Sequence, residues 1–120
     1  MPARVLACLA PEVRAQLRAA VAGGHVLFAD DIEDALHALT HLDFDMVLIG
    51  MRFDESRGLE LMQRVSANTT FARMPVVGVR DAPVRPGTLQ AFDVPMRTLG
   101  AQEIVDLGVV PGLLRGLSPS

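Results

Sequence analysis

Two histidines and an aspartate have the spacing of a metal site on a helix. His37 and His41 are four residues apart and Asp34 precedes them by one turn, so the three side chains lie on one helical face. Imidazole and carboxylate groups placed in this way could bind a transition metal. However, this face is opposite the apolar stripe of the same segment, and the sequence places no further strong ligand beside it. We therefore expect an exposed polar face and no metal site.

Two pairs of acidic residues follow apolar runs and could supply oxygen ligands. Asp30 and Asp31 come directly after one run, and Asp54 and Glu55 follow another a few residues later. The first pair also precedes an amphipathic segment in which Asp34 occupies the acidic position of a capping box. We therefore expect Asp30 or Asp31 to cap a helix. For Asp54 and Glu55 we expect a solvated loop.

Arg80 stands at the end of a third apolar run, 76–79. A guanidinium group at this position could pair with Asp54 or bind a small anion. Arginine side chains more commonly extend over the surface with the charged head in water. We expect an exposed Arg80 and keep the two other roles open.

Other catalytic patterns are missing from the sequence. There is no glycine-rich phosphate loop and no G-x-G-x-x-G motif after a strand. No serine or cysteine carries a nucleophile signature with a histidine. The single cysteine, Cys8, lies in an apolar run, which predicts a small buried side chain. We expect neither enzymatic activity nor a cofactor.

Composition favours one globular domain. The chain has 120 residues, half of them hydrophobic, which is enough to bury a core. Its net charge of −3 does not provide the basic surface that nucleic acids require. No apolar run is long enough to span a membrane, and no leader opens the chain, so we expect a cytoplasmic protein. All eleven basic residues are arginines, which leaves the chain without a lysine.

Strand-like and helix-like patterns alternate along the chain. Short apolar runs predict strands at 4–9, 25–29, 46–49, 76–79 and 103–107. Helical spacing of apolar residues predicts helices from Pro11 to Val21, at 32–42, at 58–67, from Leu89 to Leu99 and at 111–117. Residues 81–87 contain two prolines and a glycine and should be irregular. We expect one domain at 1–117, with 118–120 as a tail or the start of a linker.

Apolar spacing also predicts the buried face of each helix. The stripe of the second helix is Ile32, Ala35, Leu36, Leu39 and Leu42. For the third helix we expect Leu59, Met62 and Val65 to point inward. The fourth helix contains Pro95, which removes a hydrogen-bond donor, so we expect that helix to be short or kinked.

Five strands alternating with five helices predict an α/β fold with a parallel sheet covered on both faces. Right-handed crossovers leave few topologies, of which the flavodoxin-like strand order 2-1-3-4-5 is favoured. The ligand crevice of such a fold lies at the carboxyl ends of the strands. Any chemistry should therefore be found at that edge.

The stretch from Asp45 to Leu61, DMVLIGMRFDESRGLEL, resembles the third strand, loop and third helix of bacterial response-regulator receiver domains. The family pattern places an aspartate, a hydrophobic strand, a phosphoacceptor aspartate and then a glycine followed by an acidic, amphipathic helix. The residues in register are Asp45, Val47, Gly58, Leu59, Glu60 and Leu61. The resemblance covers nearly the whole chain and is weaker around the fourth helix.

The resemblance implies five active-site positions, and this chain departs from the family at each of them. The magnesium-binding acid pair aligns with Leu9 and Ala10, and the phosphoacceptor aligns with Gly50. The Thr or Ser aligns with Arg80 and the lysine with Leu107. Apolar side chains offer no oxygen ligands to magnesium. We therefore expect a degenerate receiver, or pseudo-receiver, without the usual phosphotransfer.

Two functions follow from this reading of the sequence. The first is a phosphorylation-independent signalling module that binds a protein partner or a second copy. Receivers use the face of the fourth helix, fifth strand and last helix for this purpose, and here it carries the apolar residues Val109, Val110, Leu113, Leu114 and Leu117. The alternative is a sensor of a small anion or nucleotide, bound in the emptied crevice between Leu9, Gly50 and Arg80. Neither function involves nucleic acid or a membrane.

Overall fold

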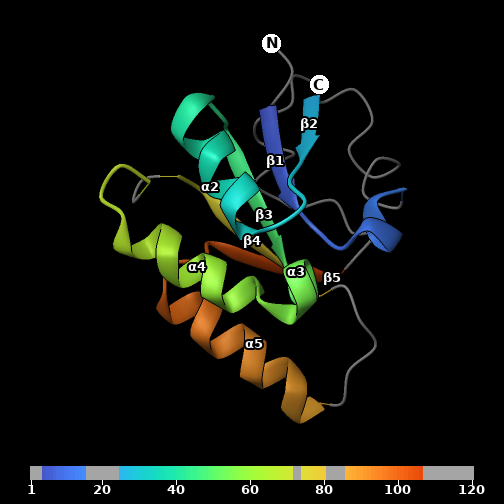
Figure 1. Cartoon of the computed structure of the whole chain (residues 1–120). Coiled ribbons are helices and arrows are strands. Elements are labelled where there is room, and N and C mark those ends of the chain that lie inside the picture. Colours follow the sequence, from blue (N-terminus) through green and yellow to red (C-terminus); the bar gives the residue numbers. More distant parts are fainter. Residues whose placement is uncertain (1–3, 16–24, 72–73, 81–85, 107–120) are drawn as a thin grey trace, which may run out of the picture.

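The protein is a five-stranded parallel sheet with the strand order β2-β1-β3-β4-β5 (Figure 1). The computed structural model describes residues 4–15, 25–71, 74–80 and 86–106. The strands are β1 (Arg4–Cys8), β2 (His25–Phe28), β3 (Met46–Gly50), β4 (Val76–Arg80) and β5 (Glu103–Asp106). The predicted flavodoxin-like topology is confirmed. All four strand pairs are parallel.

The central strand β3 is buried along its whole length. Its apolar residues alternate between the two faces of the sheet, as the pleat of a strand requires. Val47 and Ile49 contribute to the core under the helices, whereas Met46 and Leu48 contribute to the core of the opposite face. A strand that is buried on both sides has no polar face, which explains the continuous apolar run in the sequence.

Three helices cover one face of the sheet: α2 (Ile32–His41), α4 (Gly58–Ala67) and α5 (Pro86–Thr98) (Figure 1). On the opposite face, Val13 of the short helix η1 (Pro11–Val13) packs against the sheet. The remainder of the helix predicted from Pro11, and the helix predicted at 111–117, lie outside the described residues. Within the described ranges, no helix has the length and apolar character needed to cross a bilayer.

Helix α2 begins with a reciprocal cap. The Asp31 carboxylate accepts a hydrogen bond from the Asp34 amide at 2.7 Å, and the Asp34 carboxylate accepts one from the Asp30 amide at 2.9 Å. The cap is therefore Asp31, one of the two predicted residues. The prediction for Leu42 is wrong. Its backbone is extended just beyond the helix, and 44% of the residue is exposed.

Helix α4 turns a different face to the sheet than the sequence suggested. Met62 and Val65 are buried as predicted, but Leu61 is fully buried and Leu59 only partly. The reason is the position of Gly58, which packs against the end of β3 and so sets the rotation of the helix.

Helix α5 is longer than predicted. It has 13 residues, starts at Pro86 and continues through Pro95. Proline suits the first turn of a helix, so Pro86 and Gly87 belong to α5 and not to an irregular segment. Phe92 and Met96, on either side of Pro95 in sequence, are both buried against the sheet. Burying each side chain contributes about 1.5–3 kcal/mol, which offsets the cost of an interior proline of about 3 kcal/mol.

Cys8 provides a test of the packing of β1. The residue is fully buried. Burial, with a smaller contribution from the negative charge of Asp34, raises the pKa of its thiol. In the unfolded chain the thiol loses its proton near pH 8.5, whereas in the folded chain it keeps it. The contribution of this thiol to the free energy of unfolding should therefore be fully present below about pH 8.5. Above that pH the free energy of unfolding should fall by up to about 1.4 kcal/mol per pH unit.

Urea titrations between pH 8 and 10 measure this decline. The chain has no lysine and no tyrosine, so few other groups titrate in that range. The matched control is Cys8→Ala, whose stability should stay nearly constant over the same range. Equal slopes for the two proteins would show that the thiol is not protected in the folded state.

Candidate functional site

The predicted crevice positions meet at the carboxyl edge of the sheet. Leu9 and Ala10 directly follow β1, Gly50 ends β3 and Arg80 ends β4. The strand register brings these ends together, because β3 pairs with both β1 and β4. The fifth position, Leu107, lies outside the described residues. The structure thus assembles four of the five positions at one place.

These positions do not fit a magnesium ion. Leu9 is fully buried and Ala10 is 6% exposed. Gly50 is also buried and has no side chain. A hard divalent cation needs several oxygen ligands and exchangeable water around it. Two buried apolar side chains and a glycine provide only backbone carbonyls, so Leu9, Ala10 and Gly50 supply no side-chain oxygen to such an ion.

The carbonyl group of Gly50 is covered by the start of α4. A Cβ atom added to Gly58 would lie 2.2 Å from the Gly50 oxygen, much closer than van der Waals contact. Only glycine allows this approach of a helix to a strand end. The Gly50 carbonyl at the end of β3 is therefore packed against the backbone at the start of α4.

The segment between β3 and α4 forms a short left-handed turn that the sequence did not predict. It is labelled α3 (Phe53–Ser56), and Asp54, Glu55 and Ser56 have φ values of 50°, 58° and 65°. This conformation costs roughly 1–2 kcal/mol per residue for side chains other than glycine. Phe53, which is 1% exposed, anchors the turn in the core. The backbone amide of Arg57 closes it on the Phe53 carbonyl at 2.7 Å.

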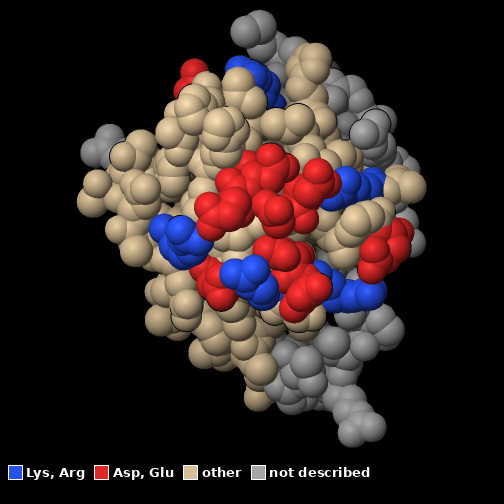
Figure 2. Space-filling model, viewed as in Figure 1, with Lys and Arg blue, Asp and Glu red and all other residues tan. Residues whose placement is uncertain are grey.

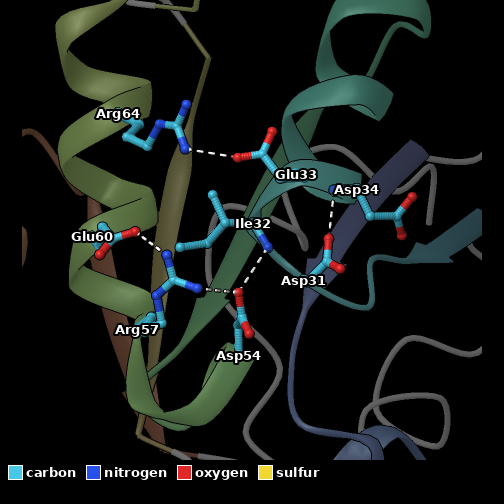
Figure 3. Close-up of polar contacts among 8 residues, drawn as sticks. All are labelled: Asp31, Ile32, Glu33, Asp34, Asp54, Arg57, Glu60 and Arg64. Atoms are coloured by element: carbon cyan, nitrogen blue, oxygen red, sulfur yellow. Dashed lines mark hydrogen bonds and ion pairs between the residues drawn. The ribbon is translucent and has the colours of Figure 1, made fainter.

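Asp54 connects this turn to helix α2. Its carboxylate accepts a hydrogen bond from the Ile32 amide at 3.1 Å and one from the Arg57 guanidinium at 3.2 Å (Figure 3). The first bond satisfies one of the free amides at the start of α2, in the manner of a helix cap supplied from another segment. The Asp54 side chain is 18% exposed. The expectation of a solvated loop is therefore wrong for Asp54, although it holds for the exposed Glu55.

Arginine–carboxylate pairs extend this connection across the surface. Arg57 also bonds Glu60 on α4, and Arg64 of α4 bonds Glu33 of α2 at 3.1 Å (Figure 3). The hydrogen bond to Glu60 raises the pKa of Arg57 above its ordinary value. These pairs are about half exposed or more, so surface screening leaves each of them a small contribution to stability.

The same region carries a cluster of negative charge, which Figure 2 shows at the centre of the molecule with arginines around it.

The histidine pair lies on the exposed face of α2. The ring centroids of His37 and His41 are 4.2 Å apart, and a hydrogen bond of 2.9 Å joins the His41 Nδ1 to the His37 carbonyl. Asp34 takes part in the helix cap. Within the described residues, no group of three or more histidine, cysteine or acidic side chains could hold a metal ion.

Arg80 pairs with two carboxylates that the sequence analysis did not single out. Its guanidinium donates to Asp93 of α5 at 3.1 Å. Its Nε lies 2.9 Å from Asp106 of β5, at ion-pair distance but outside hydrogen-bond geometry. The side chain is 24% exposed. Arg80 therefore neither pairs with Asp54 nor extends freely into solvent.

The two partners of Arg80 carry a weak signal in the sequence. Asp106 ends β5 as Arg80 ends β4, and these residues are register partners. Asp93 directly follows the buried Phe92, which places it beside the sheet. Both inferences require the correct strand ends and the correct rotation of α5.

Neither protein-family models nor curated proteins gave a match to this sequence. Solved structures did match. A candidate response regulator from Chloroflexus aurantiacus J-10-fl has a TM-score of 0.77 at 18% identity, over 97% of this chain and 93% of that one. The chemotaxis protein CheY4 of Vibrio cholerae has a TM-score of 0.73 at 20% identity, over 97% and 95%. The Mn²⁺-bound response regulator Rcp1 has a TM-score of 0.69 at 12% identity, over 88% and 81%.

These structures are receiver domains or proteins built on them, and the chain has the same fold. At such identities the similarity establishes the fold alone. The sequence resemblance to receivers is therefore confirmed at the level of the fold.

The close packing of Gly58 against the end of β3 can be tested directly. Replacement by alanine would push a Cβ atom into the Gly50 carbonyl. Although alanine favours a helix over glycine by about 1 kcal/mol, the clash should dominate and lower the free energy of unfolding by about 1–3 kcal/mol. Urea denaturation measures the change. The control is Gln63→Ala on the exposed side of α4, which should stay within about 0.5 kcal/mol of the parent. A Gly58→Ala protein as stable as this control would contradict the close packing.

The ion pair between Arg80 of β4 and Asp93 of α5 should stabilise the packing of these two elements. Arg80→Met leaves the Asp93 carboxylate, which is 23% exposed, without its cation. We expect a loss of about 1–3 kcal/mol in the free energy of unfolding. Arg97→Met is the control. Arg97 is exposed on α5, the helix that carries Asp93, and has no ion pair within the described residues. A double-mutant cycle with Asp93→Asn isolates the pair, and a coupling energy near zero would show that it does not hold α5.

Proposed function

We propose that this chain is a receiver-like signalling module that acts through protein–protein contact and does not depend on aspartyl phosphorylation. One observation carries the proposal. The fold of a receiver is present, but Leu9, Ala10 and Gly50 stand buried at the places where the phosphotransfer chemistry would be. We propose that this module has neither catalytic activity nor a cofactor.

Electrostatics support the same conclusion. Aspartyl phosphate and its metal ion concentrate charge that surrounding groups must balance. At the end of β4, Arg80 is already balanced by Asp93 and Asp106. At the end of β3, Asp54 is engaged by the Ile32 amide and Arg57. The polar groups near the crevice thus serve as structural contacts.

The alternative function, a sensor of a small anion or nucleotide in the crevice, has less support. Leu9 and Gly50 are buried, so neither presents a surface to a ligand. The positive charge of Arg80, which would have attracted the anion, faces two carboxylates. We therefore favour the interaction module.

The partner surface that we propose is the side of α5 and β5. Val94 of α5 is 60% exposed there, the largest exposure among the bulky apolar side chains of the described residues. The apolar residues first considered for this face, Val109, Val110, Leu113, Leu114 and Leu117, lie outside the described residues. A protein partner, or a second copy of the chain, would cover this side.

Amide NMR spectra with and without magnesium and beryllofluoride test the proposal. Because no carboxylate stands at the end of β3, we expect no amide peak to move. Incubation with acetyl phosphate should likewise leave the intact mass unchanged. Asp54→Asn is the matched variant, since Asp54 is the acid nearest in sequence after Gly50. A phosphoryl adduct that disappears in Asp54→Asn would overturn phosphorylation independence and identify Asp54 as the acceptor.

A further inference from the structure

A groove of about 220 Å³ lies at the amino ends of the strands, at the opposite edge of the sheet from the crevice. Its floor is the start of β1 and β2, and its wall is the connection from α2 to β3. In Figure 2, the end of the molecule with the start of β1 and the end of α2 is mostly uncharged, unlike the acidic centre. The lining residues of the groove are basic or apolar, and none of them is acidic: Arg4, His25, Val26, Leu27, Leu42 and Phe44.

The pleat of the sheet places the two basic residues of the groove side by side. Arg4 and His25 are register partners on the parallel strands β1 and β2, so their side chains leave the sheet on the same face. This is the face under the helices, because Leu6, two residues after Arg4, belongs to the core there. Both basic residues are exposed, and neither has an ion-pair partner within the described ranges. A guanidinium and an imidazole without a counter-charge therefore lie next to each other.

Exposed leucines continue the groove beyond this basic pair. Leu27 follows His25 by two residues on β2 and so lies on the same face of the sheet. Leu27 on the floor and Leu42 on the connection wall are each 44% exposed. Phe44, which packs against the core, lines the same wall as Leu42. Exposed apolar side chains that gather in this way are typical of an interface.

The acidic residues of the connection do not line the groove. Asp43 and Asp45 alternate with Leu42 and Phe44, which do line it. The Asp45 carboxylate accepts a hydrogen bond from the backbone amide of Arg4 at 2.8 Å, and the Asp45 amide donates to the Arg4 carbonyl at 2.7 Å. These two bonds fix the connection to β1. The connection therefore shapes the groove without placing a carboxylate in it.

We propose that the groove binds an acidic, leucine-containing segment of a partner protein. The carboxylates of such a segment pair with Arg4 and His25, and its leucine contacts Leu27 and Leu42. Charge complementarity selects this occupant, because a neutral or basic segment leaves the two basic side chains without a counter-charge. The neighbouring leucines require that the acidic segment also carry an apolar side chain.

The size of the groove favours a side chain of a partner over a small-molecule ligand. Pockets for small molecules and cofactors usually enclose about 300–1,000 Å³, whereas this groove has about 220 Å³. In addition, β2 is an edge strand, so no strand of the described residues lies beyond the floor on that side. Extended segments commonly dock beside edge strands. The partner segment can therefore lie along β2 with one apolar side chain in the groove.

This docking surface goes beyond the surface on α5 and β5 under "Proposed function" and does not depend on it. The groove lies at the amino edge of the sheet, whereas Val94 lies on a helix that packs across one face. A module could hold an acidic segment in the groove and present α5 to another protein. The failure of one proposal therefore leaves the other intact.

Amide NMR titrations of the whole chain with synthetic peptides test the proposal. The probe is a capped peptide of the sequence Glu-Glu-Leu-Leu-Glu-Glu, and its controls replace every glutamate by glutamine or by lysine. We expect the probe to move the amide peaks of Arg4, His25, Leu27 and Leu42. It should bind at least about tenfold more tightly than either control, because only the probe supplies the counter-charge. Added salt should weaken this binding, since exposed charges are screened.

Variants of the groove locate the bound peptide. Arg4→Glu reverses the charge of the floor, and Leu42→Ser removes the exposed leucine of the wall. Each should weaken binding of the probe at least about tenfold. The matched controls are Arg97→Glu, which makes the same charge reversal on the exposed side of α5, and Leu42→Met, which keeps an apolar side chain. Both controls should bind like the parent, and circular dichroism and urea midpoints verify that all four variants fold.

Several outcomes would overturn the groove as a site for an acidic segment. One is a probe that leaves the groove amides unmoved at millimolar concentration, or that moves only amides of α5 and β5. Another is a lysine control that binds as tightly as the probe. Equal shifts of the groove amides with inorganic phosphate alone would show a site for small anions. Sedimentation with phosphatidylglycerol vesicles that is lost in Arg4→Glu, together with no binding of the probe, would identify a membrane-binding surface instead.

Discussion

The approach of helix α4 to the end of strand β3 is the constraint on which the rest of this carboxyl edge depends. Gly58 lies against the Gly50 carbonyl at a distance that excludes any side chain. With the helix so close, the chain between them must turn tightly, and it does so through three left-handed residues that start at Asp54. The strain of this turn is offset by the buried Phe53 and by the hydrogen bonds of Asp54. The rotation of α4, the conformation of the turn and the hydrogen bond from the Ile32 amide to Asp54 are thus linked to one contact.

Charged groups at this edge hold elements together. Asp54 ties the β3–α4 turn to α2, and Arg80 ties β4 to α5 and β5. The side chains of Asp54 and Arg80 are each less than a quarter exposed, so water screens their interactions only partly. Strand ends that leave polar groups free can bind ligands. Among the described residues of this edge, Asp54 and Arg80 are engaged within the protein, and Leu9 and Ala10 are buried and apolar.

The two edges of the sheet consequently differ in character. At the carboxyl edge, where α/β folds usually bind ligands, the described residues include a buried Leu9, a Gly58 that packs against Gly50, and an Arg80 that forms internal ion pairs. The amino edge keeps exposed leucines and charged side chains around a groove. Contacts with other proteins need exposed apolar surface more than they need a pocket for chemistry.

The sequence by itself indicated the strands and narrowed the cap of α2 to Asp30 or Asp31, because both depend on local periodicity and on short-range hydrogen bonds. The strand order followed from the handedness of the crossovers between parallel strands. The sequence also established that Leu9, Ala10 and Gly50 offer no side-chain oxygen in any conformation. Only the tertiary structure decided the partners of Asp54 and Arg80, the rotation of α4 and the exposure of Leu42. These features depend on how crossover connections place distant segments, and a periodic pattern contains no information on the distance between two side chains in different elements.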